Sequence, residues 1–310
     1  MIVSMHKVSL IFNPAAGRVR RAPEMIGHIR AALRAAGVET TPLATSAPGD
    51  ATALARQAVE RKDQFIVVCG GDGTINEAAQ ALVGTGTALA VWPGGTANVL
   101  AKELDLPNDP KMLAALIADG HARTISVGSA LKPGTDWQRY FLLMAGVGID
   151  AAIVRGVNPR LKRKTAYGAF WASALDYLAR LPLTPFSLGV DDMRHEGVFA
   201  CIANASSYGG WFTIAPKARL EEAELDVCLF NSRGRASLLA YALLGLTGSH
   251  TRSSGVIYRK AKTAVANSND AAPVQLDGEF VGMLPMRFEI LPHALKLIAP
   301  ERSSHQKTGQ

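Results

Sequence analysis

A short strand, a glycine turn and a helix follow one another twice in the first third of the chain, and this repeated order constrains the fold more than any other feature. Residues 65–69 (FIVVC) form a continuous apolar run, which is typical of a strand buried on both faces. The run leads into GGDGT at residues 70–74 and then into a helical pattern of apolar residues. The same order returns at residues 88–104, where PGGT follows the strand-like run. Alternating strands and helices predict a parallel α/β sheet.

This α/β character extends over residues 1–125 and then changes. Within that region the strand-like segments are 8–12, 38–44, 65–69 and 88–92, and the helical segments are 23–36, 49–61, 75–83 and 97–104. Beyond it, short strand-like segments separated by turns are typical of antiparallel structure. They are 124–130, 140–144, 186–190, 198–204, 225–230 and 286–291, with helical exceptions at 151–181 and 237–246. We therefore predict an α/β domain over residues 1–125, a mainly antiparallel domain over residues 126–291, and a polar, disordered tail at residues 302–310.

Length and composition support two globular domains. The chain has 310 residues, against about 150 for one typical domain. Its residues are 48% hydrophobic and 19% charged, which excludes a disordered chain or a charge-dense nucleic-acid arm. The net charge of +7 is compatible with nucleotide phosphates, an anionic membrane or nucleic acid as partners, and it does not choose among them.

Cysteine usage and apolar segments indicate the compartment. Cys69, Cys201 and Cys228 are far apart and lie in apolar runs, so we expect buried reduced thiols rather than a disulfide framework or a zinc site. The N-terminus lacks the charged and apolar regions of a signal peptide. The longest apolar run, residues 238–246, is shorter than the roughly 20 residues that span a bilayer. We expect a cytoplasmic protein whose contact with a membrane is peripheral, at the inner face.

The glycine turn at residues 70–74 has the chemistry of a phosphate site. Gly70, Gly71 and Gly73 allow the backbone to approach a ligand closely, and the exposed N–H groups of such a turn suit phosphate oxygens. The negative charge of Asp72 in this turn is explained by a magnesium-nucleotide or by a proton to be abstracted. The alternative is a tight strand-to-helix turn in which Asp72 caps a helix.

Other turn residues are expected at the same edge of the sheet, because ligands of open α/β sheets bind where the parallel strands end. They are Asn13, Pro14 and Gly17 after the first strand, Thr45 after the second, and Thr96 and Asn98 in the PGGTAN turn. Thr45 is equally well explained as a helix N-cap. Far downstream, Asp277-Gly278-Glu279 has the pattern of a hairpin turn, and its two carboxylates would reach a phosphate site only through the packing of the domains.

Four segments carry a resemblance to a known family: GGDGTINEAAQAL, PGGTANVLAKEL, AGVGIDAAIVRGVNPRLKRKTAYGAF and LDGE, in this order. With them the chain resembles the diacylglycerol kinase catalytic-domain family, in its soluble bacterial lipid kinase branch, and is similar to sphingosine and ceramide kinases. The resemblance covers roughly residues 5–300. It implies an N-terminal Rossmann-like α/β domain of the NAD kinase and phosphofructokinase kind, a C-terminal β-sandwich, ATP in the cleft, and a return of residues 292–301 to the first domain.

The resemblance also implies roles for individual residues. Asp72 matches the essential acid of the glycine loop, Glu279 matches the proton acceptor for the lipid hydroxyl, and Asp277 lies beside it; the roles of Asp72 and Glu279 can be exchanged. The implied ATP-binding residues are Asn13, Pro14, Gly17, Thr45, Gly70, Gly71, Asp72, Gly73, Thr74, Asn76, Thr96 and Asn98. ATP with Mg²⁺ would suffice for phosphoryl transfer, which depends mostly on positioning and charge neutralisation.

The chain departs from the family pattern at two places. Val99 stands where many members have Asp, which removes a metal or head-group contact. The structural magnesium loop of the family, usually Leu-x-Asp-Gly-x-Leu, is LEEAEL at residues 220–225. If this loop binds metal, the ligands would be the side chain of Glu222 and the backbone carbonyls of Arg219 and Glu224.

Basic residues around Pro159 form the candidate membrane surface. Arg155, Arg160, Lys162, Arg163 and Lys164 indicate either a solvated face or a patch for anionic lipids. The expected partners are a lipid substrate, an anionic membrane surface and a second copy of the chain, whereas nucleic acid is not expected. The predicted function is ATP-dependent transfer of a γ-phosphoryl group to the hydroxyl of a diacylglycerol-like or sphingoid lipid. The alternatives are an NAD kinase-like enzyme and a non-catalytic nucleotide-sensing protein.

Overall fold

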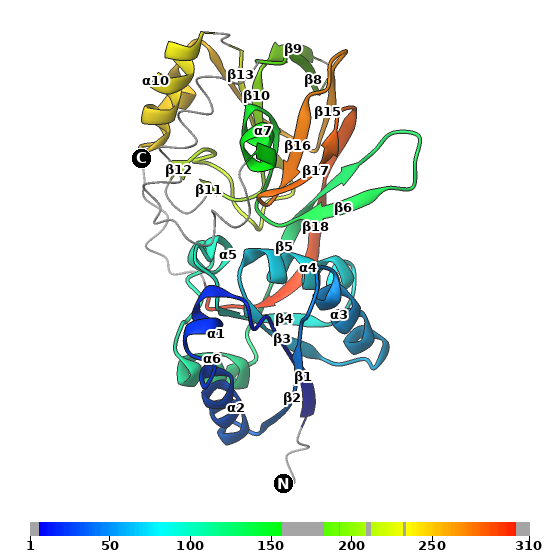
Figure 1. Ribbon diagram of the computed structural model, residues 1–310, viewed down its shortest axis with the longest axis vertical. Helices are drawn as coiled ribbons and strands as arrows, with labels where there is room; N and C mark the ends of the chain where they lie inside the picture. Colours follow the sequence, from blue (N-terminus) through cyan, green and yellow to red (C-terminus); the bar gives the residue numbers. More distant parts are fainter. Residues whose placement is uncertain (1–5, 157–182, 192, 209–211, 232–233, 302–310) are drawn as a thin grey trace. The chain divides into compact units, whose positions relative to one another are not determined.

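The computed structural model describes residues 6–156, 183–191, 193–208, 212–231 and 234–301, and the chain divides into two compact units (Figure 1). Unit 1 comprises Met1–Val127 and Pro292–Gln310, and unit 2 comprises Gly128–Leu291. Unit 1 is an α/β domain with a parallel sheet, and unit 2 is an antiparallel β-sandwich, which confirms the predicted fold class. None of the helices in the described residues has both the length and the apolar character needed to cross a bilayer.

The parallel sheet of unit 1 has the strand order β2-β1-β3-β4, and the end of β18 pairs with β4 in the same direction. These strands are β1 (His6–Phe12), β2 (Val38–Ala44), β3 (Phe65–Gly70), β4 (Ala88–Pro93) and β18 (Met286–Ile298). Every residue of β4 is buried, and in β3 only Phe65 is partly exposed. Both faces of β3 and β4 are therefore covered, which is why the sequence of these two strands is a continuous apolar run.

Helices follow the strands of unit 1 in alternation. They are α1 (Gly17–Arg21), α2 (Met25–Ala35), α3 (Asp50–Glu60), α4 (Asp72–Leu82), α5 (Val99–Glu103) and α6 (Pro110–Asp119). The apolar stripe of α2 and that of α6 share one core cluster with Trp92 and alternate residues of β3. The sequence analysis did not predict α6, although Asp109 caps its first turn and Gly120 ends it with a positive φ of 69°.

Unit 2 contains two antiparallel layers around a common core. One is a six-stranded sheet in the order β14-β13-β10-β7-β16-β17, and the other contains β18-β15-β8-β9 and the β5–β6 pair. Side chains of both layers pack in one buried cluster, which contains Val147 and Val227 of the first sheet and Leu188 of the second. The strands are β5 (Ala122–Leu131), β6 (Gln138–Phe141), β7 (Met144–Gly148), β8 (Phe186–Val190), β9 (Met193–Gly197), β10 (Phe199–Ala203), β13 (Leu225–Phe230), β14 (Val256–Ala261), β15 (Thr263–Asn267), β16 (Pro273–Leu276) and β17 (Glu279–Met283).

Smaller elements complete unit 2. They are the helices α7 (Ile149–Gly156) and α10 (Arg235–Gly245), the 3₁₀ turn η1 (Ser249–Arg252) and the short strands β11 (Ser207–Tyr208) and β12 (Phe212–Thr213). The predicted helix over 151–181 is described only as far as Gly156. Most of the basic cluster, from Arg160 to Lys164, therefore lies outside the described residues.

Two strand predictions for unit 2 were wrong in their extent. The predicted strand 140–144 is divided between β6 and β7, because the backbone between them turns its N–H groups to a carboxylate instead of a neighbouring strand. The predicted strand 286–291 continues to Ile298 as the long strand β18. The three cysteines agree with the prediction, since all of them are buried and free.

Candidate active site

The two glycine turns of unit 1 contact each other backbone to backbone. The N–H of Gly94 donates to the carbonyl of Gly70 at 2.8 Å. A Cβ atom on Gly95 would lie 2.5 Å from the Cα of Gly71, a separation that no side chain tolerates. The turns after β3 and β4 are therefore paired as the sequence predicted, and the pairing requires glycine for close approach.

The turn after β1 joins this pair. The Asn13 side chain donates from Nδ2 to Oγ1 of Thr74 at 3.2 Å, while its Oδ1 accepts from the N–H of Ala15. A Cβ on Gly17 would lie 3.1 Å from Oγ1 of Thr96. Three turns that are distant in sequence thus meet where parallel strands end, which is the edge at which α/β sheets bind ligands.

Asp72 occupies the first position of α4 but its side chain serves another helix. The N–H of Leu100, in the first turn of α5, donates to Oδ1 of Asp72 at 3.2 Å. Burial raises the pKa of Asp72, and backbone N–H groups of α5 and its N-cap oppose that shift. The alternative that Asp72 caps a helix thus has support, although the helix is α5 and not the one that Asp72 begins.

Asn98 also stabilises the second glycine turn from within. Its Oδ1 accepts from the N–H of Gly95 at 2.9 Å, and its Nδ2 donates to the carbonyl of the same residue at 3.0 Å. The backbone of Asn98 has a positive φ of 49°, which asparagine adopts more readily than most residues. Its side-chain amide therefore shapes the loop that carries Thr96.

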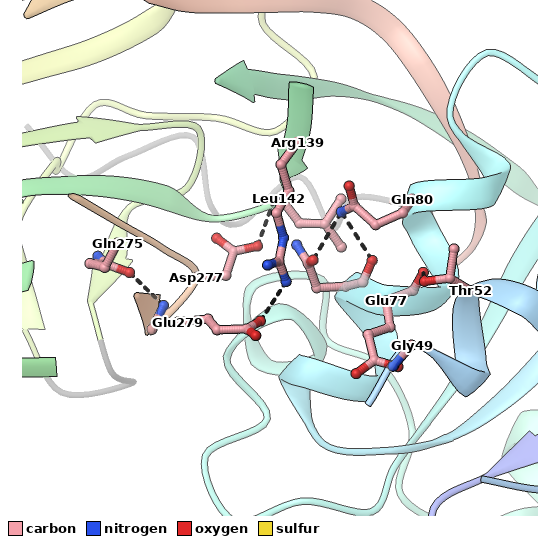
Figure 2. A network of polar contacts seen from close by, with 11 residues as sticks. Gly49, Thr52, Glu77, Gln80, Arg139, Leu142, Gln275, Asp277 and Glu279 are labelled. Atoms are coloured by element: carbon pink, nitrogen blue, oxygen red, sulfur yellow. Dashed lines mark hydrogen bonds and ion pairs between the residues drawn. The ribbon is translucent and has the colours of Figure 1, made fainter. Parts of the chain in front are cut away.

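Thr45 ends β2 and does not cap a helix. Its N–H donates to the carbonyl of Phe12, whereas the N-cap of α3 is Gly49, so the N-cap alternative was wrong. The sequence analysis missed Glu77, whose carboxylate accepts from the N–H of Gly49 at 3.0 Å (Figure 2). The carbonyl of Glu77 accepts from the Thr52 hydroxyl at 2.7 Å, so this residue joins α4 to the start of α3.

Asn76, another predicted ATP-binding residue, is buried in α4. Its Oδ1 accepts from Nε2 of Gln80 at 2.9 Å, one helical turn further on (Figure 2). Pro14 is exposed in the turn that follows β1, and Gly73 is exposed at the start of α4. Among these predicted residues, Asn76 is therefore buried inside α4, whereas Pro14 and Gly73 lie at the surface.

In unit 2 the two carboxylates of the DGE turn have different surroundings. The turn joins β16 to β17, and positive φ values of 48° at Asp277 and 82° at Gly278 identify the predicted two-residue hairpin. The Asp277 carboxylate accepts from the N–H groups of Leu142, Leu143 and Met144 at 2.7, 2.9 and 2.9 Å. This carboxylate fastens β7 to the hairpin.

Glu279, in contrast, points into solvent from the first position of β17. Its side chain is 58% exposed, and Oε2 is 2.5 Å from Nη2 of Arg139 on β6 (Figure 2). The sequence analysis missed Arg139, which is 140 residues away in the chain and has no motif around it. Of the two acids in the turn, Glu279 is the one whose oxygens a substrate hydroxyl can reach.

The loop of Arg219, Glu222 and Glu224 does not fit the predicted metal. The ammonium of Lys260 is paired with the carboxylate of Glu222 and lies 3.2 Å from Oδ2 of the buried Asp226. The backbone carbonyl of Arg219, one of the predicted ligands, accepts from the N–H of Glu222 at 3.0 Å. A lysine thus supplies the positive charge that a cation would bring, and the described residues contain no cluster of three or more metal-ligating side chains.

A magnesium ion carried by a nucleotide needs fewer ligands from the protein than a resident ion does. Mg²⁺ keeps most of its shell as water and phosphate oxygens and takes only one or two carboxylates. The glycine turns offer the half-buried Asp72 and the hydroxyls of Thr74 and Thr96. This donor set fits a nucleotide-borne Mg²⁺ better than a resident ion.

Comparisons with known proteins identify the family of the chain. The family description "Diacylglycerol kinase catalytic domain" matches residues 7–130, and "YegS C-terminal NAD kinase beta sandwich-like domain" matches residues 144–299. A diacylglycerol kinase of Bacillus subtilis (strain 168) is 29% identical over 307 residues, covering 97% of this chain and 99% of the relative. A diacylglycerol kinase of Mycobacterium tuberculosis (strain ATCC 25618 / H37Rv) is 30% identical over 298 residues, covering 95% of both.

A solved structure extends the comparison to the fold. A putative diacylglycerol kinase from Bacillus anthracis str. Sterne has a TM-score of 0.79 and 25% sequence identity, with 97% of both chains covered. The fold, the paired glycine turns and these relatives define a kinase that acts on a lipid alcohol. More particularly, the chain belongs to the diacylglycerol kinase family.

Proposed function

We propose that this protein uses ATP to phosphorylate the hydroxyl of a diacylglycerol-like or sphingoid lipid. The observation that supports this most is the meeting of three turns, after β1, β3 and β4, at one edge of the parallel sheet of unit 1. Glycine-rich turns of this kind let a ligand approach the backbone closely, and backbone N–H groups at such an edge suit the phosphates of a nucleotide. The lipid acceptor is proposed from the names of the relatives, which are diacylglycerol kinases.

Each participating group has a limited task in the proposed reaction. The oxygen of the lipid hydroxyl forms a bond to the γ-phosphorus, the bond from that phosphorus to the ADP oxygen breaks, and the hydroxyl proton passes to a carboxylate. We assign the proton to Glu279, because it is the exposed acid of the DGE turn. Asp72 holds the first turn of α5, which follows the second glycine turn, through the N–H of Leu100. Mg²⁺ bound with ATP would neutralise charge on the phosphates.

A phosphate-transfer assay with labelled ATP over a panel of lipids tests the proposal. We expect phosphorylated product from diacylglycerol or a sphingoid base, and a fall of about 100-fold or more in kcat for Glu279→Gln, the usual contribution of a general base. Asp72→Asn should lower activity as well. Retention of full activity by both variants would contradict the assignment. NADP formation from NAD, or ATP binding without any product, would point to an NAD kinase or a nucleotide sensor.

A further inference from the structure

Helix α10 (Arg235–Gly245) of unit 2 exposes leucines to solvent. Leu239, Leu243, Leu244 and Leu246 are four of the seven large hydrophobic side chains exposed in the described part of the chain. Leu243 and Leu246 are 69% and 53% exposed. Single exposed leucines are ordinary on a protein surface, but a group of them on one short helix marks an interaction site.

Three of the four exposed leucines share one side of α10 and its C-cap. Leu239, Leu243 and Leu246 follow the spacing i, i+4, i+7, so they form one stripe along the helix. The opposite side is held to the domain, because Leu238 is buried and the ring of Tyr241 packs against Phe230 of β13 at 5.5 Å between centroids. The helix is therefore anchored by one side, and the stripe on its other side is exposed.

The sequence that contains α10 is basic. Between Asp226 and Asp270 the sequence contains no acidic residue, while it contains Arg233, Arg235, Arg252, Arg259, Lys260 and Lys262. Arg252 is exposed at the end of η1, the 3₁₀ turn that packs against α10. Lys260 is already paired with Glu222 and Asp226, so Arg252 is the cation that lies exposed beside the leucine stripe among the described residues. An exposed apolar stripe with an arginine next to it suits the interface of an anionic bilayer.

We propose that α10 is a membrane anchor whose leucine stripe enters the acyl boundary of an anionic leaflet while Arg252 remains at the level of the head groups. This inference rests on the proposed function, since a lipid acceptor must be taken from a membrane. An eleven-residue helix is about 16 Å long, so it lies along the surface and does not span it.

Vesicle co-sedimentation without nucleotide tests the anchor separately from catalysis. The probes are vesicles of phosphatidylcholine alone and of phosphatidylcholine with phosphatidylglycerol. We expect the wild-type protein to prefer the anionic vesicles, and the partition coefficient of Leu243→Asn/Leu246→Asn to fall at least about tenfold. Met112→Asn, which changes a residue 63% exposed on α6 of unit 1, is the matched control and should bind like the wild type. Arg252→Gln should reduce only the preference for anionic vesicles.

Activity on two forms of substrate distinguishes this inference from the proposed function. The double leucine variant should keep wild-type activity on a short-chain diacylglycerol dispersed in detergent and lose activity on the same lipid in vesicles. Leucine-dependent vesicle binding by a protein that phosphorylates no lipid would support the anchor and contradict the kinase. Unchanged vesicle binding by a folded double variant, or conversion of a dimer to a monomer by the two substitutions, would overturn the anchor. Equal far-UV spectra and melting temperatures establish that the variants are folded.

Discussion

The turns of unit 1 and the acidic turns of unit 2 differ in what occupies them. In unit 1, Gly71 and Gly95 bring backbone against backbone, and added Cβ atoms there would lie 3.3 and 2.5 Å from the facing Cα atom. In unit 2, the carboxylates of Asp277 and Glu222 are already engaged, one by backbone N–H groups and the other by Lys260. The glycine turns are thus held together through their backbones, whereas Asp277 and Glu222 in unit 2 stabilise the protein through their side chains.

The largest effect on stability is expected where side chains are excluded. Gly95→Ala should lower the free energy of unfolding by about 3 kcal/mol, because its Cβ would lie 2.5 Å from the Cα of Gly71 and the backbone must move. Gly73→Ala is the matched control in the other turn: no atom lies within 4 Å of its added Cβ. Urea unfolding should give this variant a free energy of unfolding within about 1 kcal/mol of the wild-type value. Any change should be an increase, because alanine favours a helix more than glycine does. Equal stability of the two variants would contradict the claim that the contact between Gly95 and Gly71 excludes a side chain.

The next effect separates the two acids of the DGE turn. Asp277→Asn should cost about 2 kcal/mol, since an amide cannot accept all three N–H groups that the carboxylate accepts. Asparagine tolerates the positive φ of this position, so the loss reports on the hydrogen bonds and not on backbone strain. Thermal unfolding in parallel with Glu279→Gln should show almost no change for the second variant, because its ion pair is at the surface. A greater loss for Glu279→Gln would reverse the assignment of structural and accessible acids.

A smaller effect is expected at the loop where lysine stands in place of a metal. Lys260→Met should destabilise the protein by about 1–2 kcal/mol, a value reduced from that of a fully buried pair because Lys260 is a third exposed. The exposed neighbour Lys262→Met is its control and should change stability by less than about 0.5 kcal/mol.

The smallest expected effect is that of a chelator on the same loop. EDTA without nucleotide should leave the melting temperature of the wild type unchanged, because the ammonium of Lys260 already contacts both Glu222 and Asp226. Differential scanning calorimetry with and without Mg²⁺ measures this directly. A melting temperature that falls with EDTA and returns with Mg²⁺ would show that the loop binds metal after all.

The glycine turns could be predicted because their signals are local. Each turn directly follows an apolar strand and directly precedes a helix, and the structure places β3, α4 and β4 within one or two residues of the predicted ends except at the start of α4. That helix begins at Asp72, whereas residue 75 was predicted. The prediction was late because glycine and aspartate, which form the first turn of the helix, are residues typical of turns. The same signals gave the hairpin at Asp277-Gly278.

Partners that are distant in the chain could not be predicted in this way. Asp277 and Leu142 are separated by 135 positions, and Lys260 and Glu222 by 38, and neither pair has a motif that points to the other. The role of Asp72 is of the same kind, since its acceptor oxygen serves a helix that begins 27 residues later. Local pattern identifies a residue type at a turn, but it does not say which donor the tertiary structure will bring to it.

The sequence by itself determined the class of the domains, the order of strands and glycine turns in unit 1, and the family, because periodicity and motif spacing are properties of neighbouring residues. Only the tertiary structure decided how the acids are used: Asp72 supports α5, Asp277 holds β7, Glu222 pairs with Lys260, and Glu279 remains accessible. The physical reason is that the state of a carboxylate depends on the donors and the water around it, and folding brings those donors from distant parts of the chain.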